Sequence, residues 1–158
     1  MGQTTPPEQN RGRLLLMIGF LWLLLGVGYF YYQLNNPVVA VNWDTATEVN
    51  TAGFNIYRST SLDDEFVQIN EAAGLIPGEG SAVSGAAYNF LDQNVEANTT
   101  YYYLLEEVEY NQTVNRYHDD ILTHHVPYAP MQTVVMVAVM LVCGLGLVIK
   151  GLKEDKIV

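Results

Sequence analysis

Two long apolar blocks, one near each end of the chain, dominate the pattern of hydrophobic and polar positions. Residues 14–32 and 131–149 each run for 19 residues without a charged side chain. A helix of that length rises about 28 Å, close to the thickness of the hydrocarbon core of a bilayer. The first block ends in aromatic side chains at residues 29–32, and not in the small residues of a signal-peptide cleavage site. The pattern therefore predicts two uncleaved transmembrane helices.

The first apolar block also contains Gly19, Gly26 and Gly28. Small residues allow two helices to approach closely, but their spacing contains no GxxxG motif. We therefore expect ordinary transmembrane glycines here, without a specific helix–helix role.

Basic residues predict the orientation of the two helices. Arg11 and Arg13 precede the first block, and all three lysines follow the second. By the positive-inside rule, both termini are expected in the cytoplasm and the central segment outside, in a bacterial inner or plasma membrane. Residues 1–13 and 150–158 are expected to be polar cytoplasmic tails, the first of them disordered.

Between the blocks, apolar and polar residues alternate with the period of β-strands. Val39, Val41 and Trp43 alternate with polar or small residues, and residues 54–58 alternate in the same way. Further strands are predicted at residues 66–69, 87–92, 99–109 and from 113 to 117. Residues 71–85 are rich in Gly, Ala, Ser and Pro and predict a loop. The series predicts a small β-sandwich over residues 37–126.

Two of these stretches resemble a bacterial fibronectin type III-like domain. Residues 39–58 read VAVNWDTATEVNTAGFNIYR, which is similar to a strand ending in Trp, a TASEV-like link and a GF-x-x-YR strand. Residues 99–109 read TTYYYLLEEVE, which is similar to the family's T-x-Y-x-Y strand leading into LE-x-V. The resemblance covers about residues 38–117, half the chain. It implies an immunoglobulin-like β-sandwich, with Tyr101 as a tyrosine corner whose hydroxyl bonds to upstream backbone.

Alternation along the strands predicts which side chains form the core. The predicted core residues are Trp43, Phe54, Ile56, Tyr101, Tyr103 and Leu105. If alternation continued, Glu107 would fall on the inward face and Val108 would point out. We expect a β-bulge near Glu106 to correct this.

The chain departs from the family at its first strand, strand A. Only residues 33–37 separate the first apolar block from the Trp-bearing strand, so strand A is expected to be missing. The domain would then begin and end at the same pole, where two adjacent membrane helices can hold it. The strand that contains Val39 and Val41 would then have one edge without a neighbouring strand, and this edge could bind a partner protein. Residues 121–126, a loop, or an added strand from another protein would cover it, with coverage within the chain favoured.

The central segment is strongly acidic. Residues 33–130 contain 14 acidic residues and two arginines, a net charge of −12. This charge excludes nucleic acid as a partner and disfavours contact with anionic lipid. Cys143, the only cysteine, lies in the second apolar block, so the outer domain has no disulfide.

Residues with metal-binding or catalytic chemistry are few. His118 and His124 are weak metal candidates: on a continuous strand they would share one face, but no standard zinc spacing accompanies them. The acidic run at residues 63–65 lacks the glycine-spaced ligand loop of a calcium site and is expected to be a solvated turn. The motifs of phosphate-binding loops, serine hydrolases and zinc proteases are absent from the sequence. We therefore expect no cofactor, no metal and no enzymatic activity.

The predicted fold is thus two transmembrane helices that flank one fibronectin type III-like β-sandwich lacking strand A. Such a chain is expected to be a non-catalytic, membrane-anchored accessory or scaffold subunit of a larger membrane complex. Its helices would contact other membrane subunits, and its acidic outer domain would dock a neighbouring subunit or a basic soluble protein. The alternative is a cell-surface adhesion or carbohydrate-binding module, with Tyr102, Tyr110 and Tyr117 as stacking residues.

Overall fold

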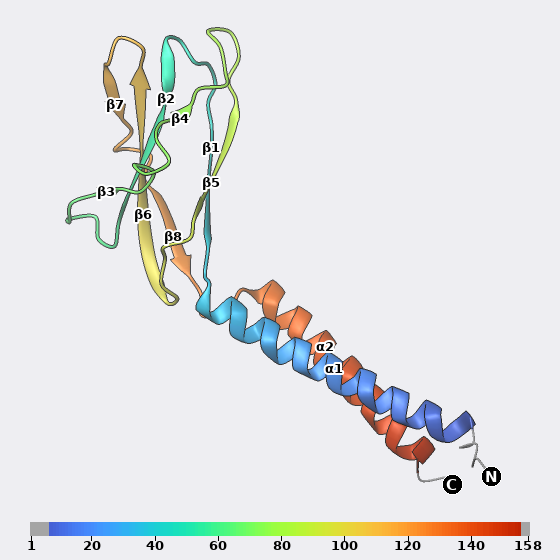
Figure 1. Ribbon diagram of the computed structural model, residues 1–158. Helices are drawn as coiled ribbons and strands as arrows, with labels where there is room; N and C mark the ends of the chain where they lie inside the picture. The colour runs from blue at the N-terminus through green and yellow to red at the C-terminus, as the bar shows by residue number, and fades with distance from the viewer. Residues whose placement is uncertain (1–6, 156–158) are drawn as a thin grey trace. The chain divides into compact units, whose positions relative to one another are not determined.

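The computed structural model describes residues 7–155, with side chains from residue 11 onward. It divides the chain into a helical unit, residues 7–36 and 129–155, and a β unit, Pro37–Tyr128. Figure 1 shows the helices and strands of both units. The predicted tails at residues 1–6 and 156–158 lie outside the described part of the chain.

The helical unit consists of α1 (Pro7–Asn35) and α2 (Met131–Asp155), each apolar and long enough to cross a membrane. Both helices extend beyond the apolar blocks, so residues 7–13 are helical and not disordered as expected, and residues 150–155 continue α2. Pro7 stands at the first position of α1, where its fixed φ favours the start of a helix. Its missing N–H costs nothing there, because the first N–H groups of a helix have no acceptor within the helix. No helix-breaking residue follows, and adding turns to an existing helix is easier than starting one.

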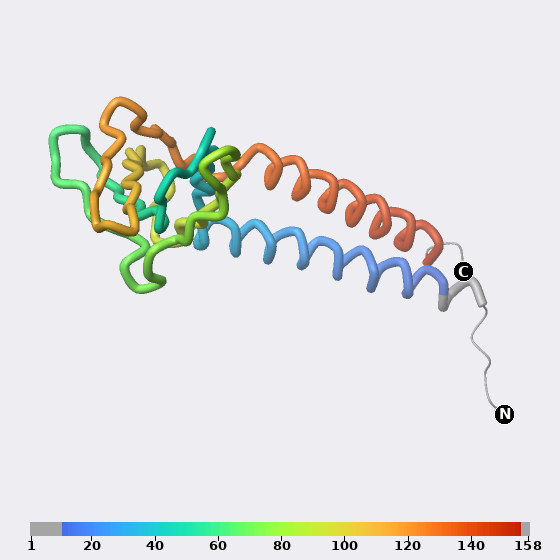
Figure 2. Tube along the Cα trace, turned by 90° about the horizontal axis from the view of Figure 1, so that it is seen from above, coloured from blue at the N-terminus to red at the C-terminus, as the bar shows by residue number. Residues whose placement is uncertain are grey.

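The two helices run antiparallel and side by side in both views (Figures 1 and 2). Glycines make this contact, contrary to expectation. A methyl group added at Gly19 would lie 2.7 Å from Cγ2 of Val148 and 2.9 Å from the Gly144 carbonyl oxygen. The glycines that meet the other helix are spaced by seven residues, which is two helical turns: Gly12, Gly19 and Gly26 on α1, and Gly144 and Gly151 on α2. The heptad spacing, and not GxxxG, was therefore the informative signal.

The β unit contains two antiparallel sheets in a β-sandwich-like arrangement (Figure 1). The smaller sheet pairs β1 with β5, and in the larger sheet β2 and β6 form the centre. On β2, the outer partners are the short strands β3 and β4, and on β6 they are β7 and β8. The strands are β1 (Val39–Asp44), β2 (Thr51–Ser59), β3 (Val67–Gln68), β4 (Ile76–Pro77), β5 (Ala87–Asp92), β6 (Thr99–Glu109), β7 (Val114–Arg116) and β8 (Leu122–Val126).

The core lies between the two sheets. Trp43 of β1 stacks on Tyr88 of β5 with ring centroids 5.0 Å apart, and its ring meets Phe54 of β2 edge-on at 5.7 Å. Among the predicted core residues, five are buried and Leu105 is partly buried against them. Tyr101 makes the expected corner contact, because its hydroxyl accepts a hydrogen bond from the Glu96 N–H at 2.9 Å.

The β unit begins and ends at one pole. Val39, at the start of β1, pairs with Asp92, and Val126, at the end of β8, pairs with Thr99. Only residues 93–98 separate Asp92 from Thr99, so all four positions lie at the same end of the sandwich. This confirms the predicted placement of the two chain ends.

One irregularity, a β-bulge, affects which side chains of β2 face inward. The bulge expected near Glu106 lies instead on β2, where Thr51 pairs with Glu109 and Gly53 already pairs with Val108. Strand β6 stays regular, so Glu107 remains on the inward face opposite Phe54. Gly53 has a φ of 158°, and a methyl group there would overlap the Ile76 carbonyl, so this site on the bulged strand admits only glycine.

Candidate functional site

One edge of β1 has no partner strand. The Thr45 N–H donates to the Ala86 carbonyl at 2.9 Å, next to the Asp44–Ala87 pair. Since bonding alternates along an antiparallel ladder, the odd-numbered residues of β1 bond to β5, and the backbone groups of Ala40, Asn42 and Asp44 point away from it. The only bond recorded for these outward groups within residues 7–155 is a weak one, from Asn42 Nδ2 to the Ala40 carbonyl at 3.4 Å.

The coverage that we favoured for this edge is wrong. Residues 122–126 form β8, but β8 pairs with β6 and not with β1. The reason is the long β6, whose 11 residues accept β7 along one half and β8 along the other.

A hollow of about 200 Å³ separates the first half of β1 from β8. On β8, Leu122 pairs with Tyr103 and His124 pairs with Tyr101, so both face inward with these core tyrosines. Nevertheless Leu122 and His124 are exposed. They remain exposed because the edge of β1 across this hollow carries no further strand within residues 7–155.

A second hollow, of about 390 Å³, continues along the other half of β1. It shares Asn42 and Leu122 with the first hollow. The core rings Trp43 and Phe54 line it, together with Glu107. We call the two hollows together the β1 groove; it follows the unpaired edge from Val39 to the connection after Asp44.

The second hollow is acidic. Asp44, Glu107 and Asp120 line it, and it contains no lysine or arginine. Glu107 is held in place because Thr51 Oγ1 and the Tyr117 hydroxyl (2.6 Å) donate to its two carboxylate oxygens. Burial, the bond to Glu107 and the nearby acidic charges raise the pKa of Tyr117 to about 12, so this tyrosine stays a neutral donor.

Trp43 leaves one polar atom unsatisfied in the same region. Its side chain is 9% exposed, and its indole Nε1 is buried without an acceptor among the described residues. Buried side-chain donors normally have a partner.

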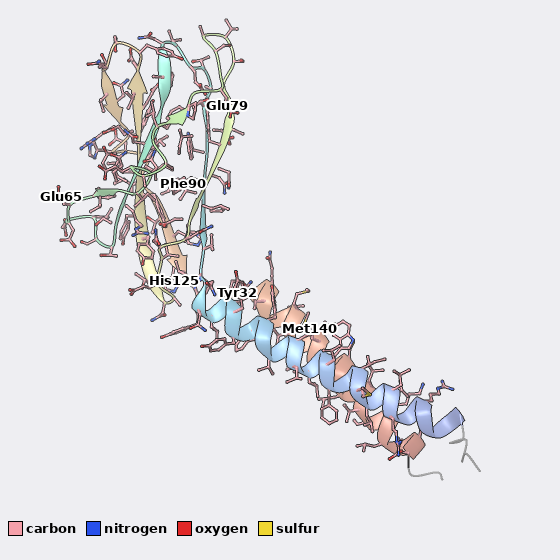
Figure 3. All side chains as sticks on the ribbon, viewed as in Figure 1. Tyr32, Glu65, Glu79, Phe90, His125 and Met140 are labelled. Atoms are coloured by element: carbon pink, nitrogen blue, oxygen red, sulfur yellow. The ribbon has the colours of Figure 1, made fainter. Side chains whose placement is uncertain are left out.

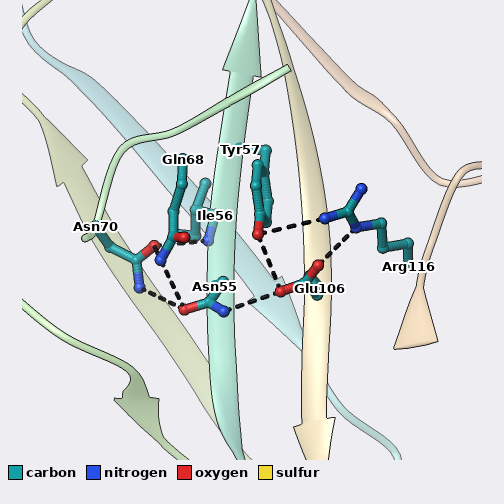
Figure 4. A network of polar contacts seen from close by, with 7 residues as sticks. All are labelled: Asn55, Ile56, Tyr57, Gln68, Asn70, Glu106 and Arg116. Carbon is teal, nitrogen blue, oxygen red and sulfur yellow. Dashed lines mark hydrogen bonds and ion pairs between the residues drawn. The ribbon is translucent and has the colours of Figure 1, made fainter. Parts of the chain in front are cut away.

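Polar networks fix the strands around the groove. Glu106, on the outward face of β6, accepts hydrogen bonds from Asn55 (2.9 Å), Tyr57 (3.1 Å) and Arg116 (2.6 Å), as Figure 4 shows. Burial alone would raise the pKa of Glu106, but these bonds outweigh it and hold the pKa below its ordinary value. The network joins β2, β6 and β7.

A second buried carboxylate, Glu48, holds the connection that leaves β1. It accepts hydrogen bonds from the Tyr88 hydroxyl, Thr45 Oγ1 (2.6 Å) and the Gly80 N–H (2.8 Å). Again burial would raise the pKa of Glu48, but the donors lower it overall. These bonds therefore hold the connection after β1 against the loop before β5, and this maintains the second hollow.

The two arginines of the β unit are both engaged. Arg58 pairs with buried Asp92 at 2.6 Å, and Arg116 pairs with buried Glu106 at 2.6 Å. Because Pro37–Tyr128 contains no other arginine and no lysine, its remaining acidic groups have no arginine or lysine partner within the unit. Some of them stand on separate loops, such as Glu65 and Glu79 in Figure 3.

The two metal candidates lie on different elements. From Arg116 to Leu122 the chain advances by six residues, while the paired residues of β6 advance by only three, from Glu106 to Tyr103. The extra residues form a turn that contains His118, whereas His124 lies in β8, so the two do not share one continuous strand. No group of three His, Cys, Asp or Glu side chains that could hold a metal occurs within residues 7–155.

The aromatic residues considered for carbohydrate binding are dispersed. Tyr102 and Tyr110 are eight residues apart along β6 and the turn after it, roughly 26 Å in an extended strand. Tyr117 lines the second hollow with its hydroxyl on Glu107. The three rings therefore do not form one stacking surface.

Sequence reasoning identified the edge of β1 but missed most of the groove. Glu107 faces the groove because β6 stays regular, and Asp120 and Leu122 reach it through the turn between β7 and β8. No local pattern marks the place of the bulge or of this turn. No protein-family model matches the chain, and neither a curated protein nor a solved structure is significantly similar to it.

Proposed function

We propose that this chain is a non-catalytic, membrane-anchored interaction protein, an accessory or scaffold subunit of a larger membrane complex. In this proposal α1 and α2 span a bacterial inner or plasma membrane with both termini in the cytoplasm. The β unit, a fibronectin type III-like domain without strand A, lies outside and docks a neighbouring subunit or a basic soluble protein.

The charge of the β unit carries the proposal. Its two arginines neutralise buried Asp92 and Glu106, so the acidic groups at the surface have no cation of their own. Their mutual repulsion opposes the compact state, and a basic partner would relieve it. Complementary charge of this kind mainly increases the rate of association and selects the partner.

The short connections to the helices also support a subunit. Three residues separate α1 from β1, and four separate β8 from α2. Each connection spans at most about 15 Å, so the domain has no stalk with which to reach distant ligands. The alternative of a carbohydrate-binding module gains no support, because Tyr102, Tyr110 and Tyr117 do not share one surface.

Purification from the native membrane in a mild detergent tests the proposal. We expect the chain to migrate in native mass spectrometry as part of a larger complex, and part of that complex to dissociate when the ionic strength is raised. A chain that is monomeric at low ionic strength would contradict the proposal.

Labelling with a membrane-impermeant maleimide tests the orientation. In a Cys143→Ser background, we expect Val83→Cys, at a position that is 90% exposed on a loop of the β unit, to react in intact cells. Lys153→Cys, near the end of α2, should react only after the cells are opened. The reverse pattern would show that the orientation is wrong.

A further inference from the structure

We propose that the β1 groove is the docking site for an extended segment of a partner protein, which adds to β1 as a new strand. The segment has apolar side chains at alternate positions and a lysine or arginine that reaches the acidic hollow. This inference rests on the proposed function and adds the surface and the chemistry of what binds there.

The backbone of β1 provides the first half of the argument. Ala40, Asn42 and Asp44 direct their N–H and C=O groups away from β5, at the spacing of a strand. Proteins usually protect such an edge with lysine, proline, a bulge or a covering segment. The strand Val39–Asp44 contains no lysine, proline or bulge, and the described chain does not cover it. The edge is therefore able to accept another strand.

The side chains opposite β1 provide the second half. Leu122 and His124 face inward from β8 and remain exposed across the first hollow. A strand paired with β1 would direct every second side chain toward them, because side chains alternate between the two faces. Apolar side chains there would cover Leu122 and the exposed side of the core.

The charge of the groove selects a basic segment. Asp44, Glu107 and Asp120 line one end of it without a lysine or arginine. Removing such carboxylates from water without a cation is unfavourable, so the incoming strand must bring one. The indole N–H of Trp43, which has no acceptor among the described residues, lies in the same region.

Within residues 7–155 no segment covers this edge of β1. A second copy would bring a β unit of the same net charge, −12, against the first. The occupant is therefore a different protein.

The test uses the full chain in detergent micelles and a synthetic eight-residue peptide of alternating valine and threonine with a lysine at each end. At millimolar peptide, we expect hydrogen exchange of the Ala40, Asn42 and Asp44 amides to slow by roughly tenfold or more, because these donors become bonded. The same peptide with alternate amides N-methylated, or with both lysines replaced by glutamate, should give little protection.

Proline substitutions on the two sides of the small sheet provide a matched pair. Ala40 and Leu91 face each other across the β1–β5 ladder, and each directs its N–H away from the other strand. Proline is tolerated at such edge positions. We expect Ala40→Pro to abolish protection by the peptide and Leu91→Pro to retain it. Leu122→Lys, at a position that is 43% exposed, should weaken peptide binding without any change in the backbone.

Three results would overturn the proposal: unchanged exchange at saturating peptide, loss of binding in Leu91→Pro but not in Ala40→Pro, or a dimer of the chain that Ala40→Pro dissociates. If Ala40→Pro does not fold, Leu122→Lys decides. Unchanged exchange in a chain that still co-purifies with partners would reject only this docking site. A monomeric chain whose β1 amides the peptide protects would reject only the larger complex.

Discussion

Replacing Asn70 with alanine should destabilise the β unit strongly, although Asn70 was not among the predicted core residues. Asn70 is 1% exposed and lies between β3 and β4, where the edge of β2 away from β6 has no strand partner at Asn55 and Ile56. Its Oδ1 accepts the Ile56 N–H at 3.0 Å, and its Nδ2 donates to the Phe54 carbonyl at 3.2 Å. The side chain therefore replaces a missing stretch of β-ladder.

Asn70→Ala would leave the Ile56 N–H buried and unpaired, and the Phe54 carbonyl would keep only its ladder partner, Ile76 of β4. An unpaired buried donor costs about 1–3 kcal/mol and a lost hydrogen bond about 1 kcal/mol, so the free energy of unfolding should fall by about 2–4 kcal/mol. With an m-value of about 1.5 kcal/mol/M, the urea midpoint would fall by roughly 1–3 M. Unfolding can be followed by the fluorescence of Trp43 in the full chain in detergent, in a Trp22→Phe background that leaves one tryptophan.

Asn89→Ala is the matched control. Asn89 also donates to another asparagine, Asn42, at 2.7 Å, but both are exposed, so the change should stay within about 0.5 kcal/mol. Asn70→Asp keeps the acceptor for Ile56 and loses the donor to Phe54. Its destabilisation relative to wild type should shrink as the pH falls, because a protonated carboxyl can donate again. Equal urea midpoints for Asn70→Ala and Asn89→Ala would refute the reasoning.

Three further predictions concern the helix contact, the acid stability and the corner. Gly19→Leu should separate α1 from α2 and lower the SDS concentration at which helical circular dichroism is lost. Gly28→Leu should not, because no atom lies within 4 Å of a methyl group added at Gly28. An equal decrease of this SDS concentration in both variants would argue against the glycine contact. The folded-state pKa of Glu106 lies below the ordinary value of 4.5, so the ionised Glu106 stabilises the fold above pH 4.5, and this stabilisation is lost as the pH falls further. On acidification, the urea midpoint of Glu106→Gln should therefore fall less than that of wild type. Urea midpoints that fall in parallel with pH for the two proteins would contradict this. Tyr101→Phe removes the bond to the Glu96 backbone and should cost about 1 kcal/mol in urea unfolding, whereas Tyr110→Phe, at a position that is 75% exposed, should change nothing.

Strongly periodic segments were predictable. The alternation in residues 87–92 and 99–109 predicted β5 and β6 with their observed bounds, because one face of each strand must be apolar. The buried positions Trp43, Phe54 and Ile56 follow from the same alternation. The apolar blocks predicted two helices but not their ends, because polar residues can extend a helix that has already formed.

Where the prediction failed, the reason was a contact between segments distant in the chain. The bulge on β2 depends on its register with β6, and the turn between β7 and β8 depends on how much of β6 each strand occupies. Glycines spaced by seven acquire a role only when a second helix with matching glycines lies opposite. Asn70 and Glu48 are ordinary polar residues of loops until folding buries them beside unpaired main-chain groups.

The amino-acid sequence by itself determined two apolar helices, the strands between them, the acidic charge of the central segment and the short distance between the first helix and the strand that contains Trp43. These are properties of single segments, and periodicity and composition express them directly. Only the tertiary structure decided that β8 pairs with β6 and leaves the edge of β1 open, and that Asp44, Glu107 and Asp120 meet beside it. Pairing between strands depends on register, and one inserted residue is enough to turn every following side chain to the other face.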